Sequence, residues 1–131
     1  MKNPITEIDY KVLRTARPAK YKRIPVFELE GRRWFDKKNG NTYHSATVYA
    51  RRGKGATFRR ELIGRIDYAY GYGDQWGQTC YEILALAGYF PILPPLKSGM
   101  DGTTHAIEEY FRGHPEHGFF SCQDVERKGD L

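Results

Sequence analysis

The sequence predicts an α+β domain in which an antiparallel meander of three to four strands is packed by one main amphipathic helix and a shorter second helix. Two observations predict this fold class. Residues 24–70 alternate apolar and polar side chains between turn signals, as strands do, and residues 76–87 repeat apolar side chains at helical spacing. The chain of 131 residues, 40% of them hydrophobic, fits one such domain comfortably.

Three strands are expected before the main helix. The first covers residues 24–30 and the second residues 42–51. Between them stands Asn39-Gly40, a pair that tolerates positive φ at both central positions of a tight turn and therefore predicts a hairpin. A second turn, Gly53-Lys54-Gly55, leads to a third strand over residues 58–70. Both faces of that strand are mixed in character, so the pattern leaves open which face of the sheet is buried.

The main helix is expected to follow Gly73. Asp74 is a suitable N-cap, because its short carboxylate can accept hydrogen bonds from the free amides of the first turn. Apolar residues then recur at i, i+4, i+7, i+8 and i+11 across residues 76–87, the stripe of an amphipathic helix. Gly88 suits the position after the last turn, and Pro91 prevents further extension.

A second helix over residues 104–112 and a last strand over residues 119–125 complete the expected domain, which spans residues 24–125. Residues 1–23 are predicted to form a basic N-terminal arm that a partner would order. Residues 126–131 are predicted to be a frayed tail.

Several classes of protein are disfavoured. No apolar run approaches the roughly 20 residues needed to cross a bilayer, and the start of the chain lacks the apolar region of a secretory signal. Cys80 and Cys122 are the only cysteines, which favours two reduced thiols over a disulfide. We therefore expect a cytoplasmic protein with no membrane partner.

Charge is distributed unevenly along the chain. The net charge is +5, but residues 1–65 hold 17 Lys and Arg against 6 Asp and Glu, whereas residues 66–131 hold 4 against 10. An asymmetry of this size suggests a basic surface that meets a polyanion, although a merely solubilising surface is the alternative.

Three short runs carry a resemblance. They are Arg33-Trp34-Phe35-Asp36, residues 39–45 (NGNTYHS) and Tyr70-Gly71-Tyr72-Gly73. With these runs the chain resembles small uncharacterised proteins of bacteriophages and prophages that share a similar "RWFD…NGNTYHS…YGYG" sequence ahead of an amphipathic helix. The resemblance covers about residues 24–90. It implies a bacterial host cell as the setting and implies no activity.

Basic and aromatic residues gather in the expected sheet. Guanidinium groups that converge on one edge of antiparallel strands suit phosphate oxygens, and tyrosine rings offer faces on which bases stack. The opposing interpretation is that the rings belong to the core and the cations only face solvent. The candidate ligand-binding residues are Arg33, Tyr43, His44, Tyr49, Arg51, Arg52, Arg59, Arg60 and Tyr70.

Other chemistry has weaker support. The Tyr70–Asp74 turn precedes a helix and could expose amides to an anion, but its own carboxylate competes for them and no Walker pattern follows. His44 with Asp36 or Asp67 could make an acid–base pair, and Ser45 and Cys80 are possible nucleophiles, yet none of them sits in a recognisable nucleophile setting. The histidines within residues 105–117 fit no standard zinc spacing. We therefore expect no catalytic residue, no metal and no cofactor.

The sequence thus predicts a non-enzymatic, phage-type binding protein that holds nucleic acid or a nucleotide signal through a basic, tyrosine-rich surface. The alternative is a counter-defence or host-takeover protein that inhibits a host protein by direct contact, with acidic residues of the second half (Asp101, Glu108, Glu109, Glu116) as its working face. Both alternatives allow a homo-oligomer, and the identity of the ligand stays open.

Overall fold

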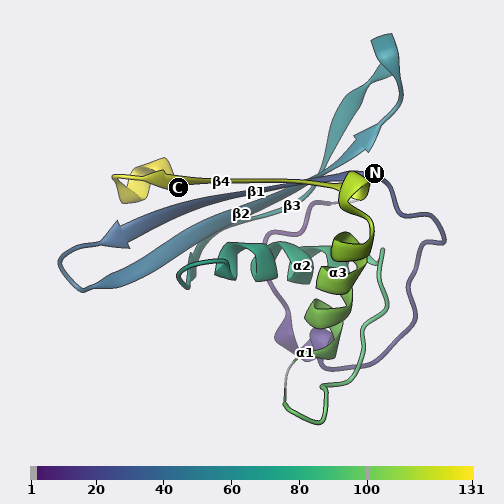
Figure 1. The fold of residues 1–131 in the computed structure, drawn as a ribbon, viewed down its shortest axis with the longest axis horizontal. Helices are drawn as coiled ribbons and strands as arrows, with labels where there is room; N and C mark the ends of the chain where they lie inside the picture. The colour runs from purple at the N-terminus through teal and green to yellow at the C-terminus, as the bar shows by residue number, and fades with distance from the viewer. Residues whose placement is uncertain (1–2, 100) are drawn as a thin grey trace.

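A computed structural model describes residues 3–99 and 101–131 and consists of a four-stranded sheet with helices against one face (Figure 1). The strands lie in the order β3-β2-β1-β4. Their bounds are Phe27–Asp36 for β1, Asn41–Arg52 for β2, Arg59–Tyr70 for β3 and Gly118–Val125 for β4. The helices are α1 (Tyr10–Leu13), α2 (Gln75–Ala87) and α3 (Gly102–Gly113), with short 3-10 turns η1 (Gly55–Thr57), η2 (Pro115–His117) and η3 (Lys128–Asp130).

The α+β class is confirmed, but the expectation of a purely antiparallel sheet is wrong. β1, β2 and β3 pair antiparallel through their hairpins, whereas β4 returns beside β1 and runs parallel to it. The parallel pairing matches Phe27 with Gly118 and Trp34 with Val125. The helical segments between β3 and β4 provide the long crossover that a parallel neighbour requires. Local periodicity cannot reveal this partner, because it lies about 90 residues earlier in the chain.

The core lies between the sheet and α2. Phe27 and Leu29 of β1 and Val48 of β2 point toward the helix, and all three are fully buried together with Ile83 and Leu84. Removing these side chains from water is the main stabilising contribution to such a domain.

Gly31 allows a close approach between the sheet and α2. A Cβ atom at this position would lie 2.4 Å from the Trp76 ring, so any larger residue would push the helix away from β1. The sheet and α2 can therefore pack closely only with glycine here.

The N-terminal residues lie along the helical side of the sheet. Ile5 pairs with β3, since its amide donates to Ile63 O at 2.9 Å and its carbonyl accepts from Arg65 N at 2.7 Å. The Asp9 carboxylate caps α1, which packs against α2. Residues 3–23 are thus in contact with the domain in this structure.

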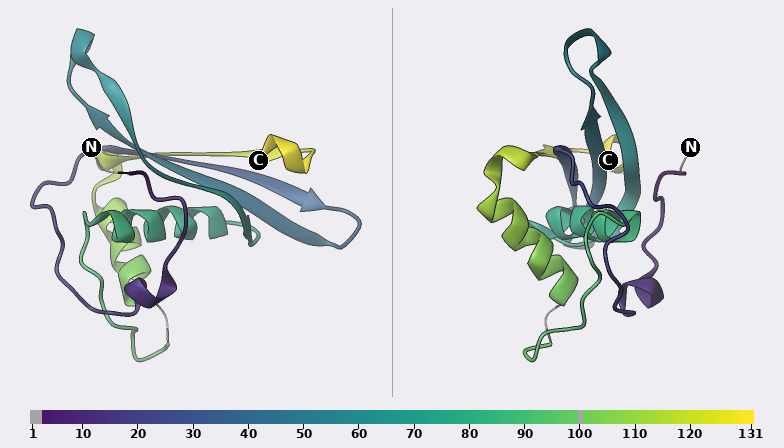
Figure 2. Two further views of the ribbon diagram at one scale, coloured as in Figure 1. Left: turned by 180° about the vertical axis from the view of Figure 1, so that it is seen from behind. Right: turned by 90° about the vertical axis from the view of Figure 1, so that its right-hand side faces the viewer.

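The two hairpins of the sheet differ. The predicted β1–β2 hairpin is confirmed. At its turn Gly40 takes positive φ (+72°) and Asn39 does not, and the Asp36 carboxylate accepts from the amides of Lys38 and Asn39. The β2–β3 hairpin, with η1 at its tip, extends beyond the other strands and rises on the side opposite the helices (Figures 1 and 2). Among the described residues, no helix is long and apolar enough to cross a membrane.

Candidate nucleic-acid interface

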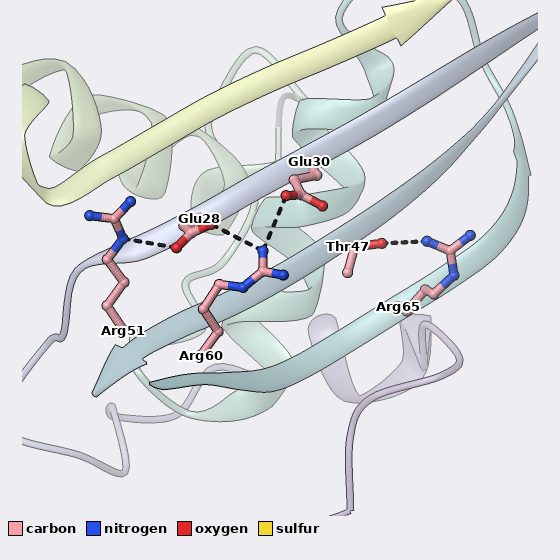
Figure 3. A network of polar contacts seen from close by, with 6 residues as sticks. All are labelled: Glu28, Glu30, Thr47, Arg51, Arg60 and Arg65. Carbon is pink, nitrogen blue, oxygen red and sulfur yellow. Dashed lines mark hydrogen bonds and ion pairs between the residues drawn. The ribbon is translucent and has the colours of Figure 1, made fainter. Parts of the chain in front are cut away.

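The side of the sheet opposite the helices, here called the open face, is crossed by a network of ion pairs (Figure 3). The Glu28 carboxylate accepts from Arg51 Nε at 2.9 Å and from Arg60 Nη1 at 3.2 Å. The same Arg60 nitrogen lies 3.5 Å from Glu30. One carboxylate therefore ties together β1, β2 and β3 at the level where the β2–β3 hairpin leaves the sheet.

Strand alternation explains why these charges meet. Phe27 and Leu29 point toward α2, so Glu28 and Glu30 point to the open face. The register sets Glu28 opposite Tyr49 and Arg51 opposite Arg60, which brings the two arginines beside the carboxylates. Opposite charges in neighbouring strand positions stabilise a sheet by roughly 0.2–1 kcal/mol per pair.

Both arginines also lie over aromatic rings. The guanidinium carbon of Arg51 is 3.9 Å from the centroid of Phe119, and that of Arg60 is 4.2 Å from the centroid of Tyr49. Arg51 donates to Glu28 through its Nε alone, and Arg60 donates to Glu28 and Glu30 through a single terminal nitrogen, Nη1. The remaining N–H groups are left for acceptors such as phosphate or base-edge oxygens, on guanidinium planes that are already oriented.

Aromatic side chains occupy the other end of the open face, near the β1–β2 hairpin. Trp34 stacks on Tyr43 with centroids 5.9 Å apart, and Tyr43 stacks on Tyr68 at 4.7 Å with their planes 13° from parallel. Tyr70 meets Tyr43 edge-on at 5.6 Å and is 66% exposed. This row therefore presents ring surface from β1, β2 and β3 to solvent.

The C-terminal residues contact the open face between these two regions. Arg65 donates to Leu131 O at 3.0 Å, and Arg32 donates to Asp130 O at 2.9 Å. The Lys128 ammonium lies 4.7 Å from the centroid of Tyr68. Arg65 also binds Asp67 and Thr47, so its guanidinium is fully engaged. Residues 128–131 thus cover the middle of a face that is otherwise open.

The structure separates the candidate residues into groups. Five of them lie on the open face in two clusters: Tyr49, Arg51 and Arg60 at one end, and Tyr43 with Tyr70 at the other. Arg59 begins β3 just after the tip of the β2–β3 hairpin; its side chain is exposed and makes no hydrogen bond or ion pair with the described residues.

Arg33, His44 and Arg52 lie on the helical side or at its edge. Arg33 pairs with Asp124 at 2.8 Å and donates to Gly73 O at 3.0 Å. His44 is 1% exposed; its ring nitrogens lie 3.2 Å from Gly71 O and 2.8 Å from Thr79 Oγ1, and burial lowers its pKa. Arg52 donates to Glu61 and to the Tyr89 hydroxyl.

Sequence reasoning missed Glu28, Glu30, Phe119 and Arg65 as parts of this face. The two glutamates had a signal, because they occupy the polar positions of an alternating strand. Phe119 had none, since its place beside Arg51 depends on the parallel pairing of β4.

The candidates for an anion site, a nucleophile and a metal site are not supported by the structure. Asp74 precedes α2 without a side-chain cap hydrogen bond. Burial raises the pKa of the Cys80 thiol, which disfavours the nucleophilic thiolate. His114 stacks on Tyr110, and His117 Nδ1 lies 2.6 Å from the Tyr110 hydroxyl in a hydrogen bond. No group of three or more His, Cys, Asp or Glu in the described part of the chain is arranged to hold a metal ion.

Comparison with protein-family models, with curated proteins and with solved structures finds no match to this chain.

Proposed function

We propose that the protein binds single-stranded nucleic acid across the open face of its sheet. The observation that supports this most is the pair of arginines, Arg51 and Arg60, each oriented over a ring and each with unused N–H groups. Proteins that bind single strands without sequence preference combine cations along the backbone with rings on which bases stack. The stacked row of Trp34, Tyr43 and Tyr68 provides such rings on the same face.

The ion pairs limit how much of the basic charge acts on this ligand. Glu28 and Glu30 offset Arg51 and Arg60, and Asp67 offsets Arg65. Four cations near the β2–β3 hairpin can then contact phosphates. They are Arg51 and Arg60, through the N–H groups that the glutamates do not use, and the exposed side chains of Arg59 and Lys54. About four phosphate contacts give a salt slope near −3 for a single strand, at roughly −0.7 per contact. We therefore expect moderate affinity with a gentle salt dependence.

Binding to a host protein through the acidic second half of the chain is the alternative, but the acidic residues expected to form that contact surface have partners within the domain. The Asp101 carboxylate caps α3 by accepting from the amides of Thr103 and Thr104. Glu108 and Glu109 both pair with Arg112. The resemblance to phage proteins would place either activity in the cytoplasm of a bacterial host.

Fluorescence anisotropy with labelled single-stranded oligonucleotides tests the proposal. Tyr70→Ala should weaken binding by roughly 1–3 kcal/mol with little change in salt slope, because it removes an exposed ring of the aromatic row and no cation. Arg60→Ala should weaken binding and lower the slope by about one contact. Arg112→Ala, the same charge change on α3, is the matched control and should have no effect. Equal losses for Arg60→Ala and Arg112→Ala would reject the open face as the site.

A further inference from the structure

A cavity of about 400 Å³ lies on the helical side, between β3, the end of α2 and the N-terminal residues. None of the residues considered for nucleic-acid binding lines it. Its size falls within the range of small-molecule sites, which is roughly 300–1,000 Å³. The lining residues are Asn3, Ile5, Arg17, Pro18, Lys20, Tyr21, Glu61–Ile63 and Ala85–Phe90.

Backbone hydrogen bonds hold the walls of this cavity in place. Ile5 is paired with β3 on both sides of Gly64. Gly88 O accepts from the amides of Lys20 and Tyr21 at 2.7 and 3.2 Å, and Arg17 pairs with Ile92 at 3.0 and 2.9 Å. A cavity whose walls are fixed in this way loses little conformational entropy when a ligand enters.

Two glycines allow the N-terminal residues to pass so close. A Cβ atom on Gly64 would lie 2.8 Å from Ile5 O, and one on Gly88 would lie 2.9 Å from the Lys20 Cβ. Gly88 also has φ of +94°, which other residues rarely adopt. The cavity exists because these positions lack side chains.

The lining has two chemically different parts. Arg17 and Lys20 supply positive charge, and the Lys20 ammonium lies 5.7 Å from the centroid of the Tyr21 ring. Ala85 O in the last turn of α2 accepts from Gly88 N, whereas the Leu86 and Ala87 carbonyls accept no backbone hydrogen bond among the described residues. Glu61 adds a carboxylate, which lies 2.8 Å from Arg52. Tyr21 and Tyr89, with ring centroids 4.9 Å apart, and Phe90 provide aromatic surface.

We infer that this cavity binds a purine mononucleotide. The cations match a phosphate, the aromatic and aliphatic lining matches the flat base, and the carbonyl and carboxylate acceptors match the N–H donors of a purine. An aliphatic carboxylate would use the cations but would leave the acceptors without donors, which is costly in a partly enclosed site. This site is separate from the open face, so it stands or falls independently of the proposed oligonucleotide binding.

Isothermal titration calorimetry of the full chain with GMP, AMP, guanosine and decanoate tests the inference. We expect a monophosphate to bind and to raise the melting temperature by linkage. Arg17→Ala and Lys20→Ala should each weaken that binding by about tenfold, the size expected for losing one charge-assisted contact. Guanosine, which lacks the phosphate, should bind more weakly and equally to all three proteins.

Lys22→Ala is the matched control, because Lys22 is an exposed cation in the same segment but does not line the cavity. Leu62→Trp fills the cavity from a residue that is 39% exposed, and it should abolish nucleotide binding without preventing folding. Absence of binding by both monophosphates at millimolar concentration would overturn the inference. So would tighter binding of decanoate, or a monophosphate affinity that Arg17→Ala and Lys20→Ala leave unchanged.

Discussion

The two faces of the sheet are built from alternate residues of the same strands, yet different interactions stabilise them. The face toward α2 is dry: Leu29, Val48 and Leu84 are completely buried, and Gly31 brings the helix close to β1. The open face holds charges in pairs and rings in stacks, with most groups partly hydrated. Stability should therefore depend on the face toward α2, and ligand binding on the open face.

The largest effect should come from opening the dry face. Leu84→Ala leaves a cavity between α2 and the sheet and should cost about 2–5 kcal/mol of unfolding free energy, measured by chemical denaturation. Leu96→Ala is the control, since Leu96 is 41% exposed and should cost less than about 0.5 kcal/mol. Comparable losses for the two variants would contradict the assignment of α2 as the core helix.

A pH effect should also belong to the helical side. Burial, with a smaller contribution from the charge of Asp101, raises the pKa of Glu82 from 4.5 to about 7. The folded protein therefore binds this proton more tightly than the unfolded chain. The protonated Glu82 carboxyl therefore contributes to the unfolding free energy fully below about pH 4.5. This contribution is lost as the pH rises to about 7, and the loss is on the order of 2 kcal/mol. Glu82→Gln should remove this part of the pH dependence in denaturation curves at pH 5 and pH 8. If the unfolding free energy of the variant changes between pH 5 and pH 8 as much as that of the wild type, Glu82 is not the buried carboxyl group responsible.

Removing a charge from the open face should separate stability from binding. Glu28→Gln leaves an acceptor near Arg51 and Arg60 but removes the negative charge that offsets them. We expect a change in unfolding free energy of about 1 kcal/mol, because the largely buried Glu28 side chain (14% exposed) loses its charge while the glutamine keeps an acceptor for the more exposed Arg51 and Arg60. Oligonucleotide affinity should rise at low salt, with a steeper salt slope. Glu109→Gln on α3 is the control for net charge, and an equal rise in that variant would show that Glu28 has no local role.

The smallest effect on stability should come from the C-terminal residues. Deleting residues 127–131 releases Arg32 and Arg65 from Asp130 O and Leu131 O and uncovers Tyr68. If the open face binds a single strand, affinity should rise by about two- to fivefold, while the unfolding free energy changes by less than about 0.5 kcal/mol. Weaker binding after the deletion would mean that Lys128 contacts the ligand instead of blocking it.

Part of the candidate site followed from sequence because it depends on neighbours in the chain. The β2–β3 hairpin brings Arg51 beside Arg60, and both residues and Tyr49 were candidates from their spacing alone. His44 shows the limit of that reasoning. It lies in the same strand, but at a position whose side chain points toward the helices. There it is buried and hydrogen-bonded to Thr79, so it is not accessible to a ligand on the open face.

The α+β class, the three antiparallel strands and the separation of basic from acidic halves were predictable from the sequence, because periodicity, turn residues and charge act over a few neighbouring positions. The parallel pairing of β4 with β1, the place of Phe119 under Arg51, and the pairing of Glu28 and Glu30 with Arg51 and Arg60 came from tertiary packing. The same holds for the cavity that residues 3–21 help to enclose against β3 and α2. Each of these features joins residues far apart in the chain, and such contacts are selected by the packing of the whole domain rather than by any local preference.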